Sequence, residues 1–175
     1  PDLYNNRGIL YKNLEQYDKA EADYTKAIEL DPEDPEAYFK RAVVYYYLEQ
    51  YDKAETGYTK AIELDPYFVK AYNNRAFIYE DLEKYDKAEV DYTKAIELDP
   101  EFIQGYINRG NVFRSSQKYD KAEVDYTKAI EIDPEHLAAY YNRAILYYYS
   151  EQYDKAEADY TKAIELDPDN INAYN

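Results

Sequence analysis

Small and aromatic residues recur along the chain at spacings typical of α-helices. The first 34 residues hold two such sets, one formed by Tyr4, Gly8 and Tyr11 and the other by Ala20, Tyr24, Ala27 and Ile28. Each set falls on one face of a helix with 3.6 residues per turn. The pattern therefore predicts two helices in this segment and no β-strand.

Local signals indicate where these helices begin and end. Asp18, with a glutamate three residues later, resembles a capping box for the second helix, and its carboxylate suits the positive end of the helix dipole. Pro32 biases Asp31 away from helical angles, so we expect the helix to end there. Asp34 and Pro35 then suit the N-cap and first position of the next helix. The segment reads as a helical hairpin.

The hairpin pattern repeats every 34 residues. The pair Asp-Pro ends at Pro32, Pro66, Pro100, Pro134 and Pro168, and Tyr-Asp-Lys-Ala-Glu begins at Tyr17, Tyr51, Tyr85, Tyr119 and Tyr153. The repeats are 1–34, 35–68, 69–102, 103–136 and 137–170, and residues 171–175 look like the start of a truncated sixth repeat. Because one hairpin cannot bury its apolar face alone, we expect residues 1–175 to form a single array of stacked hairpins.

These residues resemble the signature of the tetratricopeptide repeat family, which is a large aromatic, Gly or Ala, Tyr, Ala, an aromatic, Ala and Pro. The first repeat supplies Tyr4, Gly8, Tyr11, Ala20, Tyr24, Ala27 and Pro32. The match continues through all five repeats, with Ala42, Ala76 and Ala144 in place of Gly and Phe113 in place of Tyr. The resemblance implies an all-α fold, a right-handed superhelical solenoid of antiparallel helix hairpins whose first helices line a concave groove.

The net charge of -16 comes from 37 acidic and 21 basic residues. Most of the excess lies on the second helices, where a typical segment such as 18–31 carries five acids and two lysines. Such a surface repels nucleic-acid phosphates and anionic membranes, so we expect neither as a partner. No apolar run is long enough to cross a bilayer. We expect a soluble and cytoplasmic protein, although the absence of Cys leaves the compartment undetermined.

The residues that catalysis requires do not occur in a recognisable pattern. The chain has no Cys, and its single histidine, His136, stands alone in a turn. Ser115, Ser116 and Ser150 have no histidine partner in the sequence pattern, and the four glycines form no phosphate-binding loop. We therefore expect no enzymatic activity, no cofactor and no metal site.

The family resemblance implies that certain first-helix positions face the groove. They carry two aromatic groups with an amide-rich stretch between them, an arrangement that suits an extended or helical peptide. The alternative interpretation is that these rings cover one another along the groove or are simply tolerated on the surface. The candidate residues are Phe39, Val43, Tyr46, Tyr47, Asn73, Asn74, Phe77, Ile107, Asn108, Asn111, Arg114, Tyr141, Asn142, Tyr148 and Tyr149.

Some family members hold a C-terminal carboxylate with a clamp of lysine, asparagine and arginine side chains. This chain has Ile9, Val43 and Phe77 where that clamp needs Asn. We therefore do not expect it to recognise chaperone tails by this route.

An arginine recurs where the family more often has Leu, and a charged residue at such a position needs a partner. In an antiparallel hairpin Arg7 lies nearly level with Asp23. We therefore predict structural ion pairs here and at the equivalent positions Arg75 with Asp91, Arg109 with Asp125, and Arg143 with Asp159. Arg41 lacks such a partner because Gly57 replaces the aspartate.

Two functions fit this sequence. The first is an interaction scaffold that binds a peptide or protein segment in the groove, which the variable first helices favour. The alternative is a structural or engineered repeat module that self-associates end to end, which the identical segments 17–32 and 153–168 also allow. Without a capping helix, Tyr160 and Ile164 would be poorly covered and available for stacking.

Overall fold

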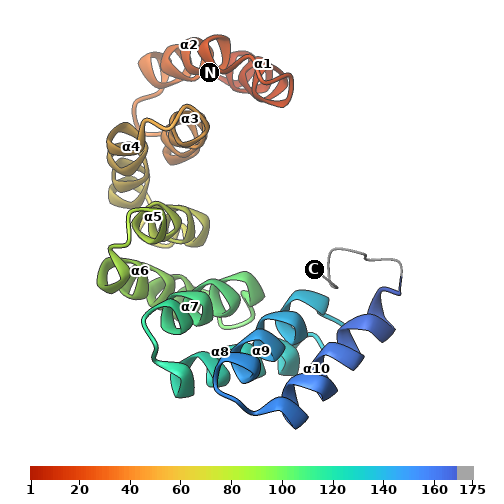
Figure 1. Cartoon of the computed structure of the whole chain (residues 1–175). Coiled ribbons are helices and arrows are strands. Elements are labelled where there is room, and N and C mark those ends of the chain that lie inside the picture. The colour runs from red at the N-terminus through yellow and green to blue at the C-terminus, as the bar shows by residue number, and fades with distance from the viewer. Residues whose placement is uncertain (169–175) are drawn as a thin grey trace. The chain divides into compact units, whose positions relative to one another are not determined.

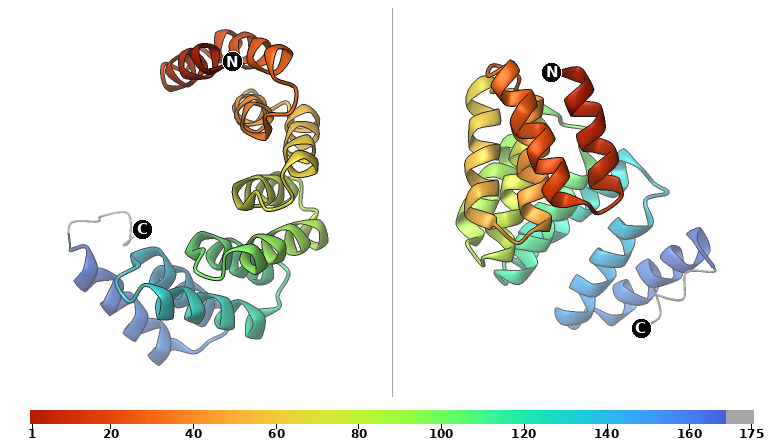
Figure 2. Two further views of the ribbon diagram at one scale, coloured as in Figure 1. Left: turned by 180° about the vertical axis from the view of Figure 1, so that it is seen from behind. Right: turned by 90° about the horizontal axis from the view of Figure 1, so that it is seen from above.

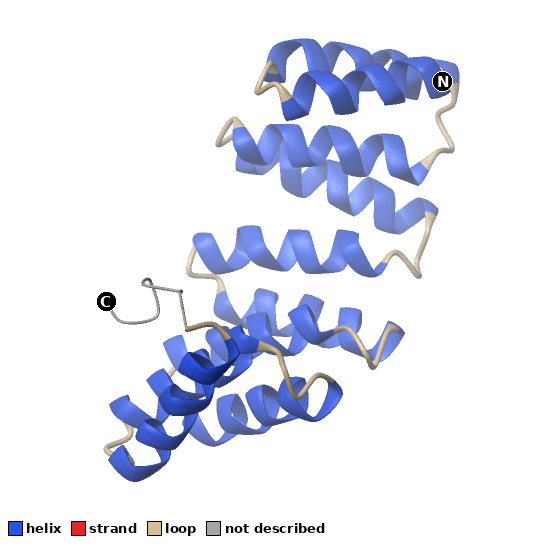
Figure 3. Cartoon of the chain, turned by 90° about the vertical axis from the view of Figure 1, so that its right-hand side faces the viewer, coloured by secondary structure: helices blue, strands red, loops and turns tan. Residues whose placement is uncertain are grey.

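The computed structural model describes residues 1–168, and the predicted start of a sixth repeat at 171–175 lies outside them. Within that range the chain forms ten α-helices joined by short loops, without a β-strand (Figure 3). Contacts divide the chain into two compact units, Pro1–Lys84 and Tyr85–Asn175, which we call unit 1 and unit 2. None of the described helices has the length and apolarity needed to cross a membrane.

Unit 1 is a stack of helical hairpins. Its helices are α1 (Asp2–Asn13), α2 (Tyr17–Leu30), α3 (Pro35–Tyr47), α4 (Tyr51–Leu64) and α5 (Val69–Asp81). Helices adjacent in sequence pack against each other, and α3 also contacts α5. The first helices of successive hairpins therefore follow one another on one side of the unit, with α2 and α4 on the other (Figure 1).

Unit 2 continues the same alternation. It consists of α6 (Tyr85–Leu98), α7 (Ile103–Ser115), α8 (Tyr119–Ile132), α9 (Leu137–Tyr149) and α10 (Tyr153–Leu166). The antiparallel pairs α7–α8 and α9–α10 form two hairpins, and α7 lies beside α9 (Figure 2). Side chains on α7 and α9 are therefore neighbours across hairpins, as those on α3 and α5 are in unit 1.

Buried tyrosines fill the space within and between the hairpins. Tyr24, Tyr58, Tyr92 and Tyr126 are the largest side chains that are almost wholly buried. Glycine faces two of these rings where the helices approach: a Cβ atom added to Gly8 would lie 2.6 Å from a ring carbon of Tyr24, and one added to Gly110 would lie 2.6 Å from a ring carbon of Tyr126. The close approach of the two helices thus explains the Gly or Ala of the repeat pattern.

The ends of the helices follow the sequence signals only in part. Asp34 is the N-cap of α3, and its side chain accepts the backbone N–H of Glu36. Asp31 is non-helical and ends α2, as predicted. The predicted capping box at Asp18 is wrong, because α2 begins at Tyr17 and its N-cap, Gln16, makes no side-chain cap bond. Asp18 lies in the first turn, where its charge still suits the helix dipole.

The turn inside each hairpin uses a left-handed residue that is not glycine. Glu15, Glu49, Glu83, Gln117 and Glu151 have φ between 55° and 61°. In the first repeat the N–H of Gln16 bonds the carbonyl of Tyr11 at 2.8 Å, and that of Glu15 bonds Lys12 at 3.0 Å. These two bonds form a Schellman motif, which satisfies the free carbonyls at the end of α1.

Candidate functional site

Three of the predicted ion pairs form as paired hydrogen bonds. Arg7 bonds both carboxylate oxygens of Asp23 at 2.7 Å, Arg109 bonds Asp125 at 2.7 and 2.8 Å, and Arg143 bonds Asp159 at 2.7 and 2.9 Å. In each pair the arginine uses Nε and Nη2, the planar fork that matches a carboxylate. The prediction is confirmed for these pairs. The pair Arg75 with Asp91 combines residues of different units and stays a prediction.

The equivalent arginines of repeats 2 to 5 also bond the preceding hairpin. Nη1 of Arg41 donates to the Thr25 hydroxyl at 3.1 Å, and Nη1 of Arg143 donates to Thr127 at 3.0 Å. Arg75 with Thr59 and Arg109 with Thr93 repeat this bond at 2.9 and 3.0 Å. Each arginine thus links its first helix to the second helix of the hairpin before it. The arginines are therefore structural residues of the stack.

A second series of bonds joins tyrosines to the preceding hairpin. The hydroxyl of Tyr45 donates to Glu21 at 2.9 Å, that of Tyr79 to Glu55 at 2.8 Å, and that of Tyr147 to Glu123 at 2.8 Å. Burial, with the bond to Glu123, raises the pKa of Tyr147 to about 12, so its hydroxyl stays a donor at neutral pH. These bonds fix the register of each first helix against the second helix of the preceding hairpin.

The fourth repeat has a different bond at the corresponding place. Phe113 replaces the tyrosine, and the ammonium of Lys118 donates to Glu89 at 2.9 Å instead. Lys121 lies 3.5 Å from the same carboxylate. These contacts lower the pKa of Glu89 against the opposing effect of its burial. An ion pair therefore takes the place of the tyrosine bond.

The first predicted aromatic group lies on α3 of unit 1, and Phe77 of α5, predicted in the stretch between the two groups, joins it. The Tyr46 ring contacts Tyr47 and Phe77 edge to face, with ring centres 5.9 and 5.8 Å apart. Its hydroxyl donates to Asp81 at 2.9 Å. Burial, together with this bond, raises the pKa of Tyr46. Tyr47 is 54% exposed and stacks on Tyr17, and Phe77 is 39% exposed. Tyr46 is therefore a fixed ring between two accessible ones.

The remaining candidates in unit 1 lie deeper. Phe39 is half-buried and packs against the rings of Tyr58 and Phe68, with centres 5.6 and 4.9 Å away. Val43 is half-buried in the same apolar cluster. The amide of Asn74 accepts a bond from Asn73 at 3.2 Å and donates to the Tyr58 hydroxyl at 3.4 Å. Phe39 and Val43 thus belong to the same apolar cluster as Tyr46, and Asn74 bonds the buried Tyr58 of that cluster.

The second aromatic group lies at the end of α9 in unit 2. Tyr148 and Tyr149 are 56% and 63% exposed, and their rings meet edge to face at 5.8 Å. Tyr148 also contacts the ring of Tyr153 at 5.9 Å. Tyr141 lies further along α9 and packs edge to face on Tyr160 at 6.1 Å. Tyr148 and Tyr149 thus form an accessible pair, while Tyr141 packs against α10 through Tyr160.

The amide-rich candidates of unit 2 are partly buried. Ile107 is 3% exposed in an apolar cluster, and Asn108 is 7% exposed and accepts a bond from Gln104 at 2.7 Å. The side-chain oxygen of Asn111 accepts a hydrogen bond from the Tyr126 hydroxyl at 2.8 Å. The Asn142 amide donates to the backbone carbonyl of Ala138 at 2.8 Å. Burial leaves Ile107 and Asn108 little surface for a ligand, whereas Asn111 and Asn142 are half-exposed.

Arg114 differs from the other candidates because a donor on it is unused. It lies in the last turn of α7, one turn beyond Asn111. Its Nε is buried and has no hydrogen-bond partner among residues 1–168. A ligand carbonyl or carboxylate oxygen would satisfy this donor.

Repeated helical hairpins, joined by the same bonds from one hairpin to the next, define an all-α repeat protein of the solenoid class. The family model of the tetratricopeptide repeat matches residues 1–34, 35–68, 69–102, 103–136 and 137–170. The chain belongs to the tetratricopeptide repeat family, and the predicted number and length of its repeats are confirmed. That the repeats form a single domain stays a prediction.

Solved structures share this fold. A crystal structure of MamA is 25% identical, with a TM-score of 0.83 over 92% of this chain and 94% of that one. YrrB, described as a tetratricopeptide protein with an unusual peptide-binding site, is 27% identical, with a TM-score of 0.77 over 98% and 88% of the two chains. MamA from Desulfovibrio magneticus RS-1 is 18% identical, with a TM-score of 0.86 over 97% and 96%. A comparison with curated proteins finds no match.

Proposed function

We propose that this protein is a non-catalytic scaffold that binds a peptide or protein segment through its first helices. The fold supports this, because the tetratricopeptide repeat family consists largely of modules that bind proteins or peptides. YrrB, one of its structural neighbours, is described as peptide-binding. The proposal requires no cofactor and no metal. The charge of -16 disfavours nucleic acid as the partner.

The observation that carries the proposal is the aromatic group of Tyr46, Tyr47 and Phe77. A hydrogen bond to Asp81 and three ring neighbours hold Tyr46 in place before any ligand arrives. Binding therefore costs little side-chain entropy, as in other interfaces built on rigid aromatic rings. The exposed edges of Tyr47 and Phe77 offer contact area for an apolar side chain of the ligand.

Unit 2 offers candidate contacts of its own. Tyr148 and Tyr149 present ring surface, and Arg114 has a buried donor without a partner within the described chain. A segment with apolar side chains and an accessible backbone carbonyl or carboxylate would satisfy both. The preferred ligand is therefore an amphipathic segment rather than a highly charged one.

A peptide-library screen tests this proposal. We would compare the wild-type protein with a variant carrying Tyr47→Ala, Tyr148→Ala and Tyr149→Ala, and with the control Tyr67→Ala. Tyr67 is 77% exposed but lies in the loop between α4 and α5. The triple variant, which we call the groove variant, is expected to bind selected peptides at least about fivefold more weakly, since truncating an aromatic anchor costs about 1 kcal/mol or more. Unchanged binding by a folded groove variant would contradict the proposal.

We propose end-to-end self-association as a second candidate function, because one face of α1 is uncovered. Leu3, Leu10 and Leu14 are 85%, 55% and 56% exposed, whereas Val44, the equivalent of Leu10, is fully buried against α2. The sequence of α10 is the same as that of α2. A second copy could therefore place α10 on α1 as α2 packs on α3, and Ile164, 36% exposed, is available on α10.

Sedimentation at increasing protein concentration tests this second function. The wild-type protein is expected to sediment faster as the concentration rises, and Leu10→Glu should abolish the effect because it places a charge on the apolar face. A sedimentation coefficient that does not change with concentration would contradict self-association. Tyr47→Ala serves as the control, because Tyr47 lies outside both end faces.

A further inference from the structure

The second repeat holds an arginine whose carboxylate partner is missing. In repeats 1, 4 and 5, Nε and Nη2 of the arginine grip both oxygens of an aspartate on the second helix. In repeat 2 the same position of α4 is Gly57. The sequence predicts that Arg41 lacks an aspartate partner. The structure shows which contacts the Arg41 side chain makes without it.

Arg41 nevertheless keeps the orientation of the paired arginines. Its Nη1 donates to Thr25 at 3.1 Å, as Arg109 and Arg143 donate to their threonines at 3.0 Å. Its guanidinium carbon lies 5.8 Å from the ring centres of both Tyr38 and Tyr45. The bond to Thr25 and the two rings therefore fix the guanidinium without help from an aspartate.

The donor that an aspartate would take is left unused. Nε of Arg41 is buried and has no hydrogen-bond partner within residues 1–168. A buried donor without a partner is costly, and more so on a charged group. The same atom donates at 2.8 Å in Arg109 and at 2.7 Å in Arg143. The second repeat thus retains the arginine of a bidentate ion pair but has no aspartate to complete it.

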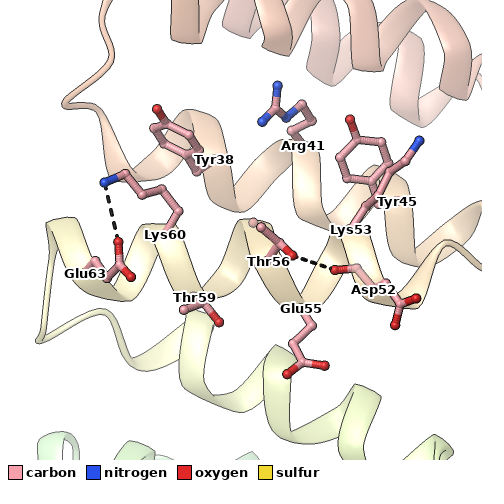
Figure 4. Close-up of a pocket in the computed structure, with 11 residues that line it drawn as sticks. Tyr38, Arg41, Tyr45, Asp52, Lys53, Glu55, Thr56, Thr59, Lys60 and Glu63 are labelled. Atoms are coloured by element: carbon pink, nitrogen blue, oxygen red, sulfur yellow. Dashed lines mark hydrogen bonds and ion pairs between the residues drawn. The ribbon is translucent and has the colours of Figure 1, made fainter.

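A cavity of about 800 Å³ opens beside this guanidinium. Figure 4 shows Arg41 between the rings of Tyr38 and Tyr45, with Thr56 on the opposite wall. The equivalent hollow in repeat 4 measures about 500 Å³, and Val124 and Asp125 line it where repeat 2 has Thr56 and Gly57. The second repeat therefore has more room where the other repeats hold their own carboxylate.

The charges around the cavity are compatible with an anion. Two of its carboxylates are already engaged, since Glu63 lies 3.4 Å from the ammonium of Lys60 and Glu55 accepts the Tyr79 hydroxyl. Lys53 places its ammonium 5.2 Å from the centre of the Tyr45 ring, on the cavity wall. Asp52, exposed at the rim, and Glu55, whose charge the Tyr79 hydroxyl does not neutralise, oppose binding and should make it weak.

We propose that the cavity at Arg41 and Gly57 binds a carboxylate, which completes the ion pair that the other repeats make internally. The ligand is either a small free carboxylate or the side chain of an acidic residue on a partner protein. In both cases the two carboxylate oxygens of the ligand accept hydrogen bonds from Nε and Nη2 of Arg41. The rings of Tyr38 and Tyr45 flank the resulting ion pair. The site shares no residue with the proposed peptide groove and does not rest on that function.

The arginine Nε–Hε signals in a nitrogen–proton NMR spectrum test this proposal directly. Acetate is titrated against chloride at constant ionic strength, and Arg41→Gln identifies the Arg41 signal by its loss. Acetate is expected to shift the Arg41 signal along a saturable curve and to leave those of Arg109 and Arg143 in place. A signal of Arg41 that does not respond, or that responds equally to chloride, would overturn the proposal.

Gly57→Asp provides the matched control, because it restores the internal carboxylate. A Cβ at this position would lie 2.8 Å from Cβ of Ala42, but repeat 5 accommodates Ala144 with Asp159, so a small shift suffices. Acetate is expected to have no effect on the Arg41 signal of Gly57→Asp. If that variant does not fold, thermal unfolding of the wild type and Arg41→Gln decides: acetate should raise only the wild-type midpoint, and an equal rise in both would contradict the site.

A second arm distinguishes the two sources of the carboxylate. Short capped peptides with a single Asp or Glu are titrated beside acetate and beside the same peptides with Asn or Gln. A saturable shift with the acidic peptides indicates a partner's side chain, and a shift with acetate alone indicates a small carboxylate. Either result supports the site, and a shift that Asn and Gln peptides reproduce would contradict carboxylate recognition.

Discussion

Arg109 and Asp125 face each other across the α7–α8 hairpin and share two hydrogen bonds of 2.8 and 2.7 Å. Both side chains are largely buried, at 17% and 3% exposure. In the first repeat Asp23 is equally well bonded, but its partner Arg7 is 55% exposed. The same pair of residues thus occurs in a buried and in a partly solvated setting.

This difference predicts unequal costs when the aspartate is replaced. Asp125→Asn should lower the free energy of unfolding by about 3 kcal/mol, because it leaves the buried charge of Arg109 without a counter-charge. Asp23→Asn should cost about 1 kcal/mol or less, since water can solvate Arg7. Urea unfolding of both variants measures the two values. Equal losses would show that burial of the arginine does not set the strength of the pair.

The hydrogen bonds that tyrosines make to the preceding hairpin predict that removing a single tyrosine hydroxyl lowers the stability of the fold. Tyr147→Phe should lower the free energy of unfolding by about 1 kcal/mol, because it removes the bond to Glu123. Tyr153→Phe is the control, since Tyr153 is 58% exposed. A double-mutant cycle with Glu123→Gln isolates the interaction. Additive losses in that cycle would mean that the bond contributes nothing.

Buried tyrosines predict a loss of stability in alkaline solution. Burial raises the pKa of Tyr24 from 10.0 to about 12. Below pH 10 the phenol is protonated in both the folded and the unfolded chain, and above it only the unfolded chain ionises. Stability should therefore fall between pH 10 and about 12.

Urea unfolding at about pH 9 and about pH 11 measures this effect. The decrease should be smaller by about 1 kcal/mol in Tyr24→Phe, which removes one titrating group. The tyrosinate absorbance of the folded protein should meanwhile report only the exposed phenols. Identical pH profiles for the wild type and Tyr24→Phe would contradict the prediction.

The left-handed glutamates predict that glycine stabilises the hairpin turns. Glu49 has φ of 58°, a conformation that a residue with a Cβ adopts at a cost. Glu49→Gly should raise the free energy of unfolding by about 0.5–1 kcal/mol. Ala22→Gly, at an exposed position in the middle of α2, should lower it by about 1 kcal/mol. A loss in both variants would contradict the role assigned to the turn.

Most of the fold follows from the sequence because the repeat makes each signal appear five times. The position of the Arg109–Asp125 pair could be predicted, since two residues level in an antiparallel hairpin must lie side by side. The bond of Tyr45 to Glu21 could not, because it depends on how one hairpin is set against the next. The turn at Glu15 was missed for another reason: a left-handed residue is usually signalled by glycine.

The candidate site was predicted less completely. The exposed rings of Tyr47, Tyr148 and Tyr149 lie on first helices as the family resemblance implied, but that resemblance could not show which positions are covered. Ile107 is buried because side chains of α6 and α8 pack around it. The free donor of Arg114 gave no sequence signal, because an arginine in the last turn of a helix is most simply read as a solvated charge.

The central claim is that ligands bind to the first helices. Chemical-shift mapping of a peptide selected from the library tests it most directly. We predict perturbations at Tyr46, Tyr47 and Phe77 in unit 1, together with their ring neighbours Tyr17 and Tyr51, or at Arg114, Tyr148 and Tyr149 in unit 2, and none elsewhere on α2, α4 and α8. Perturbations confined to those second helices would contradict the account.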